Sequence, residues 1–302
     1  MDLKDIPVRI INLDRRTDRW NKLKNTNFGF NSVERFSAYD GSKETDFNDA
    51  ADMTKLTIDS GMRRYHEEIS TKGAYACYKS HIALWKELIA SDSLYYIILE
   101  DDIVLSNFSK SYSFYDFVNE KYKLIEESKK KFDIWLIGYI KLRDCETLPN
   151  TELKSSKTFI EPASICTLTD PIVNVTSFFG LHCYMISKEI ATKLIKDTES
   201  VTFQIDGLLS IFSQLGKVNI IAFTNTSNII KQGGFISDLD HKGDICNVSE
   251  RKLASLTSNQ TVSNISYVII TVLIIIIVIL LINVSVHNNI HLEKLEIRNF
   301  QT

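Results

Sequence analysis

Short apolar runs alternate with charged, amphipathic segments along most of this chain. The runs are rich in Val, Ile and aromatic residues and are bounded by Gly, Asn or Asp, a pattern typical of buried strands. Strands that alternate with helices predict an α/β fold with a mainly parallel sheet, whose binding site lies at the carboxyl ends of the strands. We expect strands over Val8–Leu13, Leu94–Leu99, Phe132–Ile140, Phe178–Ser187 and Val218–Ala222.

Between these runs, apolar residues recur every three or four positions, as on one face of a helix. The clearest helix covers Ala74–Ser91, and the polar stretch Asn48–Glu68 has no clean period and predicts loop with a short helix. We expect further helices over Arg15–Lys24, Lys121–Lys131, Lys188–Asp197 and Ile205–Leu215.

The C-terminal part has a different pattern. Tyr267–Val286 is uncharged and dominated by Ile, Val and Leu, and at about 1.5 Å per residue such a helix reaches about 30 Å, the thickness of a bilayer core. We therefore predict a folded domain at 1–247, a polar linker at 248–264, a transmembrane helix at 265–286 and a short tail at 287–302. Because the N-terminus enters a strand without the apolar stretch of a secretory signal, we expect a single-pass C-terminal anchor with the domain in the cytosol.

Composition narrows the function only slightly. The chain has 302 residues with 44% hydrophobic and 24% charged residues, which is ordinary globular usage, and a net charge of -3. That charge offers no general attraction to nucleic acid, so we expect no nucleic-acid partner. The five cysteines lie far apart without a C-x-x-C pair, which indicates neither a zinc site nor a disulfide framework.

Three adjacent carboxylates, Glu100, Asp101 and Asp102, follow the buried strand Leu94–Leu99. Adjacent carboxylates repel one another, and a divalent cation removes the repulsion while leaving coordination positions for the phosphates of a nucleotide. The triplet predicts a metal–nucleotide site. The alternative is an acidic strand end that is only solvated.

An ordered series of motifs places this triplet in context. Ile10-Ile11-Asn12-Leu13-Asp14-Arg15-Arg16 with Arg19 is followed by Ala38-Tyr39-Asp40-Gly41, by Gly73, Cys77, Ser80-His81 and Trp85, and then by Leu99-Glu100-Asp101-Asp102. Further on come Phe132–Gly138, Gly180 with Tyr184 and Ser187, Ile205-Asp206, and Gln232–Asp238. The series resembles glycosyltransferase family 25, which contains bacterial lipopolysaccharide sugar transferases and the collagen galactosyltransferases.

This resemblance covers about Val8 to Asp238. It implies a GT-A (Rossmann-like) fold, a nucleotide-sugar donor and a divalent metal, which we expect to be Mn²⁺. On that basis Asp102 is the expected metal ligand, shared with Asp101. Asp206 is the expected base that takes the proton of the acceptor hydroxyl in an inverting transfer, although Asp is also a common helix N-cap.

The expected donor-binding residues belong to several motifs. The guanidinium groups of Arg16 and Arg19 match phosphate oxygens, yet either arginine can equally be a surface or helix-end charge. His81 can be a structural group, as histidines in helices often are. The donor-binding set is Asn12, Arg16, Arg19, Asp40, His81, Glu100 and Asp101. His241 is a further candidate metal ligand, with a solvated loop histidine as the alternative.

Together these observations predict a membrane-anchored, metal-dependent glycosyltransferase. We expect it to transfer a hexose, galactose or glucose, from a UDP-sugar to a glycan or a hydroxylated protein side chain. One alternative is a catalytically inactive, transferase-like membrane protein that binds glycans or partners. Another is a metal phosphodiesterase or nuclease, which would need further His and Asp ligands near the triplet.

Overall fold

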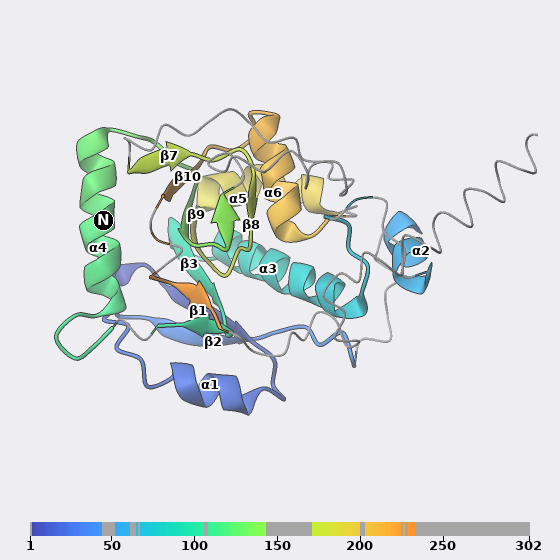
Figure 1. The fold of residues 1–302 in the computed structure, drawn as a ribbon, viewed down its shortest axis with the longest axis horizontal. Coiled ribbons are helices and arrows are strands. Elements are labelled where there is room, and N and C mark those ends of the chain that lie inside the picture. Colours follow the sequence, from blue (N-terminus) through green and yellow to red (C-terminus); the bar gives the residue numbers. More distant parts are fainter. Residues whose placement is uncertain are drawn as a thin grey trace, which may run out of the picture. The chain divides into compact units, whose positions relative to one another are not determined.

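The computed structural model describes residues 2–43, 52–60, 65, 67–105, 108–142, 171–199, 203–224, 226 and 229–233. All of them belong to one compact unit, Met1–Gly243. Its centre is a seven-stranded sheet with the order β2-β1-β3-β9-β5-β10-β7 (Figure 1). The strands are β1 (Val8–Asn12), β2 (Val33–Ser37), β3 (Tyr95–Glu100), β5 (Ile134–Gly138), β7 (Ile172–Asn174), β9 (Cys183–Ser187) and β10 (Ile220–Phe223).

The sheet is mixed. β1 pairs in parallel with β2 and β3, and β10 pairs in parallel with β5. β9 is antiparallel to both β3 and β5, and β7 is antiparallel to β10. Consequently β1, β2, β3, β5 and β10 share one direction, which confirms the predicted α/β class, whereas β9 and β7 run against it.

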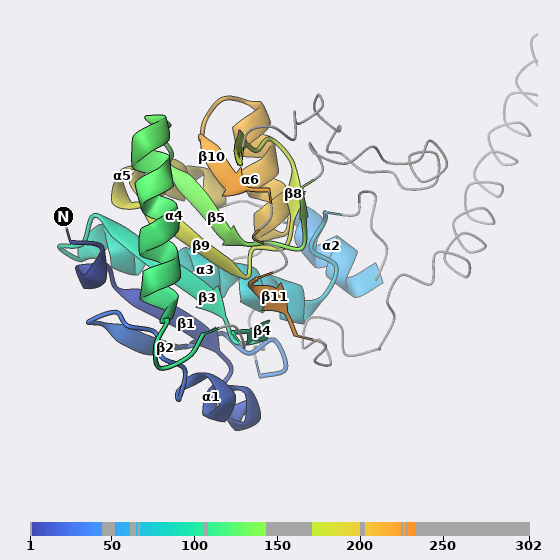
Figure 2. The ribbon, with the colours of Figure 1, turned by 60° about the vertical axis from the view of Figure 1, so that its left-hand side comes forward.

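Alternating side chains of the strands pack into two separate cores. Ile98, Leu136 and Tyr184 face one core, which also contains residues of α3 (Lys72–Ala90), α5 (Lys188–Leu194) and α6 (Ile205–Gln214). Ile97, Trp135 and Met185 face the other, with residues of α1 (Thr17–Leu23) and α4 (Phe114–Ser128). Figure 2 shows α4 crossing in front of the strands, while α3, α5 and α6 lie behind them. The sheet is therefore covered on both faces, as predicted.

Two elements differ from the sequence prediction. α4 begins at Phe114, well before the predicted Lys121, because Ser113 and Asp116 form a reciprocal capping box that starts the helix there. The predicted strand Phe178–Ser187 is divided into β8 (Phe178–Phe179) and β9, and Gly180 between them has φ +77°, a left-handed conformation that favours glycine.

Shorter elements complete the described part. α2 (Asp52–Ser60) lies within the stretch predicted as loop and short helix, and β2 is an edge strand that the apolar pattern did not reveal. The 3₁₀ helices are η1 (Leu3–Asp5) and η3 (Ile195–Thr198), and β4 (Ile103–Val104), β6 (Lys141–Leu142) and β11 (Lys231–Gln232) form the small pairs β11–β4 and β6–β8.

The predicted linker at 248–264, the transmembrane helix at 265–286 and the tail at 287–302 lie outside the described residues, as does His241. Within the described ranges, none of the helices has the length and apolarity needed to cross a bilayer.

Candidate functional site

A cavity lies where the carboxyl end of β3 meets the carboxyl ends of β1 and β2. Ligands of open α/β sheets bind at this edge, outside the carboxyl ends of the strands. Its walls come from the turn after β1, the loop after β2, the first turns of α3, the acidic triplet and β11. The polar and charged residues that line it are Arg15, Arg19, Tyr39, Asp40, Ser42, Cys77, Ser80, Glu100, Asp101, Asp102 and Gln232.

Asp101 is held on both carboxylate oxygens. Arg19 donates from Nη1 to Oδ1 at 2.8 Å, and Asn12 donates from Nδ2 to Oδ2 at 2.6 Å. Burial raises the pKa of Asp101, and its bonds to Arg19 and Asn12 act in the opposite direction. The structure thus places Asn12 and Arg19, both predicted to bind the donor, against the carboxylate of the triplet.

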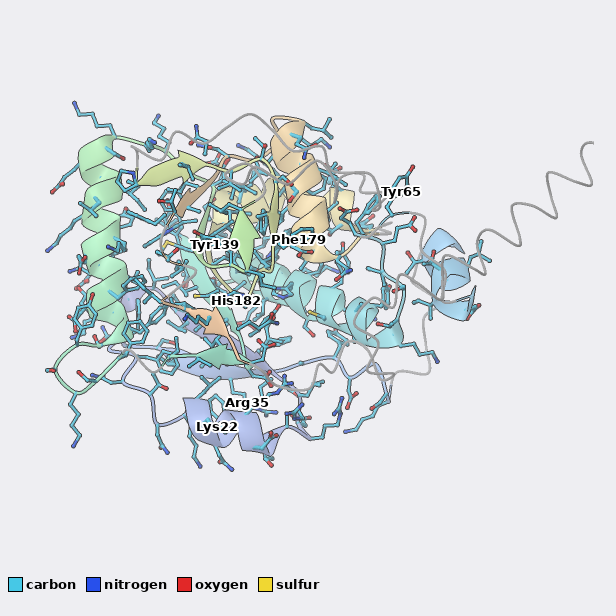
Figure 3. All side chains as sticks on the ribbon, in the orientation of Figure 1. Lys22, Arg35, Tyr65, Tyr139, Phe179 and His182 are labelled. Carbon is cyan, nitrogen blue, oxygen red and sulfur yellow. The ribbon has the colours of Figure 1, made fainter. Side chains whose placement is uncertain are left out.

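This hydrogen-bond network continues to the edge of the sheet. Arg35, labelled in Figure 3, donates from Nε to Oδ1 of Asn12 at 2.6 Å and from Nη2 to Asp14 at 2.6 Å. Ser37 also donates to Asp14, at 2.8 Å. Because these residues come from β1, β2 and the turn after β1, the network joins the ends of β1 and β2 next to the cavity.

Asp102 differs from its neighbour. Its Oδ2 accepts a bond from Nε2 of Gln232 at 2.8 Å, whereas its buried Oδ1 has no hydrogen-bond partner among the residues that the structure describes. Burial, together with the charge of Glu100, raises the pKa of Asp102 from 3.8 to about 7. A buried carboxylate oxygen without a partner is costly, and a bound cation would remove that cost. The residues present therefore fit a divalent metal, with Asp102 as its ligand.

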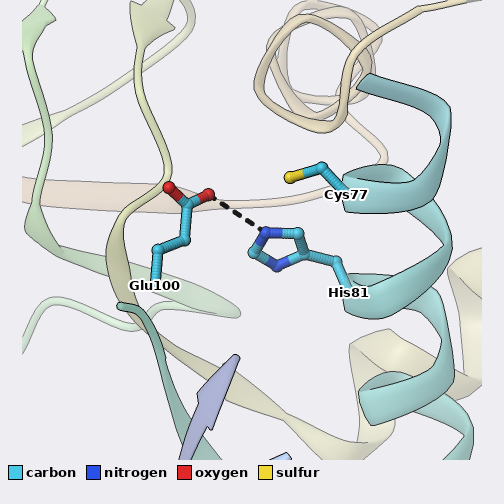
Figure 4. Close-up of side chains that lie close together, drawn as sticks. All are labelled: Cys77, His81 and Glu100. Atoms are coloured by element: carbon cyan, nitrogen blue, oxygen red, sulfur yellow. Dashed lines mark hydrogen bonds and ion pairs between the residues drawn. The ribbon is translucent and has the colours of Figure 1, made fainter. Parts of the chain in front are cut away.

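Glu100 points toward α3, where it meets His81 (Figure 4). Nε2 of His81 lies 3.2 Å from Oε1 of Glu100, and Nδ1 lies 3.0 Å from the hydroxyl of Tyr184. His81 is fully buried and does not line the cavity, so the structure connects it to the cavity through Glu100.

Cys77 lies one turn before His81 on α3. The Sγ of this thiol, a ring nitrogen of the imidazole and a carboxylate oxygen of Glu100 lie within 4.8 Å of one another. Burial raises the pKa of the Cys77 thiol, and nearby carboxylates, among them Glu100 and Asp206, raise it further. The thiol is therefore protonated. Sequence analysis did not find this trio because its third member comes from a distant strand.

Asp206 lies in the first turn of α6. Its Oδ2 accepts from the backbone N–H of Gly180 at 3.0 Å and its Oδ1 from that of Gly207 at 2.8 Å. The N-cap of α6 is Gln204, so Asp206 does not have the N-cap position that the alternative interpretation gave it. Burial raises the pKa of Asp206, and so does the charge of Glu100. Asp206 is therefore close enough to the triplet for the charge of Glu100 to act on it, but it does not line the cavity.

Of the remaining predicted residues, Asp40 lines the cavity on the side of the loop after β2, which we call the outer wall, and Arg16 does not line it. Asp40 accepts from Nε of Arg15 at 3.1 Å and from the hydroxyl of Ser42 at 2.7 Å. Arg16 pairs with Asp18 at 3.0 Å and is not in the cavity wall, whereas Arg15 is. Two adjacent arginines at a turn give no sign in the sequence of which one faces inward, and the structure places Arg15 in the cavity wall.

Comparisons with known proteins agree with this order of motifs. Three curated insect proteins, each named "Glycosyltransferase 25 family member", are similar to the chain. The proteins from Aedes aegypti and Drosophila pseudoobscura pseudoobscura are each 33% identical to it over 98 residues. The protein from Anopheles gambiae is 25% identical to it over 164 residues. The matches cover 32%, 44% and 32% of this chain but only 16%, 26% and 15% of those proteins.

Two solved structures are similar at low identity. A197 from STIV is 13% identical, with a TM-score of 0.34 over 78% of this chain and 87% of its own. HddC from Yersinia pseudotuberculosis, complexed with GMP-PN, is 14% identical, with a TM-score of 0.31 over 79% of this chain and 96% of its own. The family assignment rests instead on sequence: the profile of "Glycosyltransferase family 25 (LPS biosynthesis protein)" matches residues 5–209, more than half of the chain. The chain belongs to glycosyltransferase family 25.

Proposed function

We propose that this chain is a GT-A-type, metal-dependent glycosyltransferase that transfers galactose or glucose from a UDP-sugar to a glycan or a hydroxylated protein side chain. The proposal rests on the buried Oδ1 of Asp102, which has no hydrogen-bond partner in the described part of the chain and lies beside a cavity at the carboxyl ends of the strands. Family membership supports sugar transfer as the reaction. The curated relatives extend far beyond the matched part, so the donor and acceptor are part of the proposal.

Asp102 would hold the metal, and Gln232 fixes the second oxygen of the carboxylate. When bound, Mn²⁺ neutralises the negative charge that develops on the departing nucleoside diphosphate. Asp101 lies beside this position with both oxygens engaged. We propose that it keeps the strand end rigid and contributes negative charge to the site, and that Arg19 and Asn12 act on the donor only through it.

The outer wall supplies the contacts to the nucleotide in this proposal. Arg15 and Asp40 form an ion pair at the cavity wall next to Ser42. The guanidinium can donate to phosphate oxygens, and the carboxylate can accept from ribose hydroxyls. Glu100, which is partly exposed at its side chain, has the same ability to accept a ribose hydroxyl. Arg16 remains a prediction from the motif, with Asp18 as its partner in the structure.

We propose Asp206 as the base of an inverting reaction. Two backbone N–H groups fix its oxygens, so the carboxylate needs no rearrangement to accept a proton. Its raised pKa makes it a stronger base than an exposed aspartate. The acceptor hydroxyl would lose its proton to Asp206 as the oxygen attacks the sugar from the face opposite the diphosphate.

The membrane anchor is a separate proposal that rests on the apolar stretch Tyr267–Val286. Extraction of membranes with carbonate tests it, because an inserted helix stays with the bilayer and a peripheral protein is released. The cytosolic side for the domain stays a prediction of the sequence.

The enzymatic proposal is tested with the full chain in detergent. Mn²⁺ and a panel of nucleotide sugars are supplied, and released nucleotide is measured with and without a chelator. We expect release from UDP-galactose or UDP-glucose that requires Mn²⁺ and is lost in Asp102→Asn. Asp92→Asn, which changes an exposed carboxylate after α3, is the matched control and should keep full activity. Unchanged, metal-independent release by Asp102→Asn would contradict the proposal.

A further inference from the structure

Three aromatic residues of the family-like motifs have no role in the reaction as described so far: His81, Trp85 and Tyr184. The structure brings them together in the core between α3 and β9. Trp85 Nε1 lies 3.0 Å from the hydroxyl oxygen of Tyr184, which lies 3.0 Å from Nδ1 of His81, and Nε2 of His81 lies 3.2 Å from Glu100. Trp85, Tyr184 and His81 are each fully buried. A continuous hydrogen-bonded chain thus runs from the core to the cavity wall.

The direction of each bond in this chain follows from donor chemistry. An indole N–H can only donate, so the hydroxyl oxygen of Tyr184 accepts from Trp85. Burial raises the pKa of Tyr184 far above its ordinary value, so the phenol keeps its proton. In the described part of the chain, the hydroxyl has one other hydrogen-bond partner, Nδ1 of His81. The buried phenol proton is satisfied only if it is donated to that nitrogen.

A neutral imidazole that accepts at Nδ1 carries its proton on Nε2. That proton points at Oε1 of Glu100. The ring then has no lone pair at Nε2 to offer a cation, so His81 acts on the site through Glu100 and not as a metal ligand. Because the opposite tautomer would turn a lone pair toward a carboxylate oxygen, the tautomer decides whether Glu100 is held or repelled.

We propose that Trp85 and Tyr184 are positioning residues that fix the Nε2–H tautomer of His81, which in turn holds the carboxylate of Glu100 in place for the donor. The part of this proposal that concerns the donor rests on the proposed function, whereas the tautomer does not. The backbone N–H of Glu100 is already bonded to the carbonyl of His182 at 2.9 Å. The side-chain carboxylate is bonded to His81, and this bond orients it.

The tautomer can be measured directly. In protein labelled with ¹⁵N-histidine, long-range ¹H–¹⁵N spectra distinguish the Nε2–H tautomer, the Nδ1–H tautomer and the doubly protonated ring, and the signal of His81 is assigned by its loss in His81→Gln. We expect the Nε2–H tautomer in the unaltered protein. The Nδ1–H tautomer or an imidazolium would overturn the proposal.

Tyr184→Phe removes both the proton donor to His81 and the acceptor for Trp85. We expect a mixture of His81 tautomers and a loss of affinity for UDP with Mn²⁺ of about tenfold, the usual effect of one charge-assisted hydrogen bond. Tyr78→Phe is the matched control, because Tyr78 is also buried on the α3 side and its hydroxyl donates to the carbonyl of Thr198 at 2.7 Å. It should leave the tautomer and the affinity unchanged.

A double-mutant comparison separates positioning from general packing. The amide of Gln at position 81 can donate to Glu100 whatever its other partners are, so Tyr184→Phe should cost about tenfold in the unaltered background and nothing in His81→Gln. An equal loss in both backgrounds, or an unchanged tautomer in Tyr184→Phe, would overturn the role of Tyr184. If the tautomer is as expected but UDP does not bind under any condition, the proposed function fails and the buried chain of bonds stands.

Discussion

Asp102→Asn should make the metal-free protein more stable while removing its ability to bind a metal. In the folded protein Asp102 has a pKa of about 7, against an ordinary value of 3.8, because burial and Glu100 disfavour its charge. A carboxyl with a raised pKa in the folded state favours folding at low pH, and this contribution is lost as the pH rises from about 4 to about 7. At pH 8 the unpaired charge destabilises the fold by as much as about 4 kcal/mol, at about 1.4 kcal/mol per pH unit.

Asn at this position keeps an acceptor for Gln232 and carries no charge. We therefore expect Asp102→Asn to raise the free energy of unfolding at pH 8, by up to about 4 kcal/mol, and to have almost no effect at pH 4. Chemical denaturation with EDTA present measures both values. Adding Mn²⁺ should stabilise the unaltered protein and leave the variant unchanged. A variant that is less stable than the unaltered protein at pH 8, or equally changed at both pH values, would refute this reasoning.

Three further results are expected. Asp101→Asn should destabilise the protein by about 3 kcal/mol, measured by chemical denaturation, because it removes the carboxylate charge that pairs with the buried guanidinium of Arg19. The affinity for Mn²⁺ should fall about tenfold for each pH unit below about 7, measured by calorimetry at pH 6 and pH 8, because the proton of Asp102 must leave before metal binds. Asp206→Asn should slow transfer at least about 100-fold and leave UDP affinity unchanged, since it removes only the base; a variant with normal transfer rates would exclude Asp206 from that role.

The strands β1, β3, β5, β9 and β10 were predictable because each is a compact apolar run, and the two cores follow from alternation along them. The edge strand β2 was not predictable, because it is only half-buried and carries polar residues. The direction of β9 could not be predicted, because an antiparallel strand buried on both faces has the same composition as a parallel one. The start of α4 was missed for a local reason. Its capping box consists of Ser113 and Asp116, and the aromatic residues that follow do not have the charged periodicity by which the helix was found.

The candidate site was also predictable only in part. The sequence placed the triplet at a strand end next to a site, but adjacent carboxylates cannot be told apart by spacing. The structure separates them: Asp101 is bonded to Arg19 of α1, while one oxygen of Asp102 has no hydrogen-bond partner within the described ranges. That distinction depends on which helix packs beside the strand, which is a property of the tertiary fold. The chain from Trp85 to Glu100 likewise joins residues that are distant in sequence and are brought together by β9 pairing with β3.

The most direct test of the account is the binding of UDP to the full chain by calorimetry, with and without Mn²⁺, for the unaltered protein and for Asp102→Asn. We expect UDP to bind tightly only when Mn²⁺ is present, and we expect the variant to lose this enhancement. Equal UDP affinity with and without the metal, or the same enhancement in the variant, would contradict a metal held by Asp102.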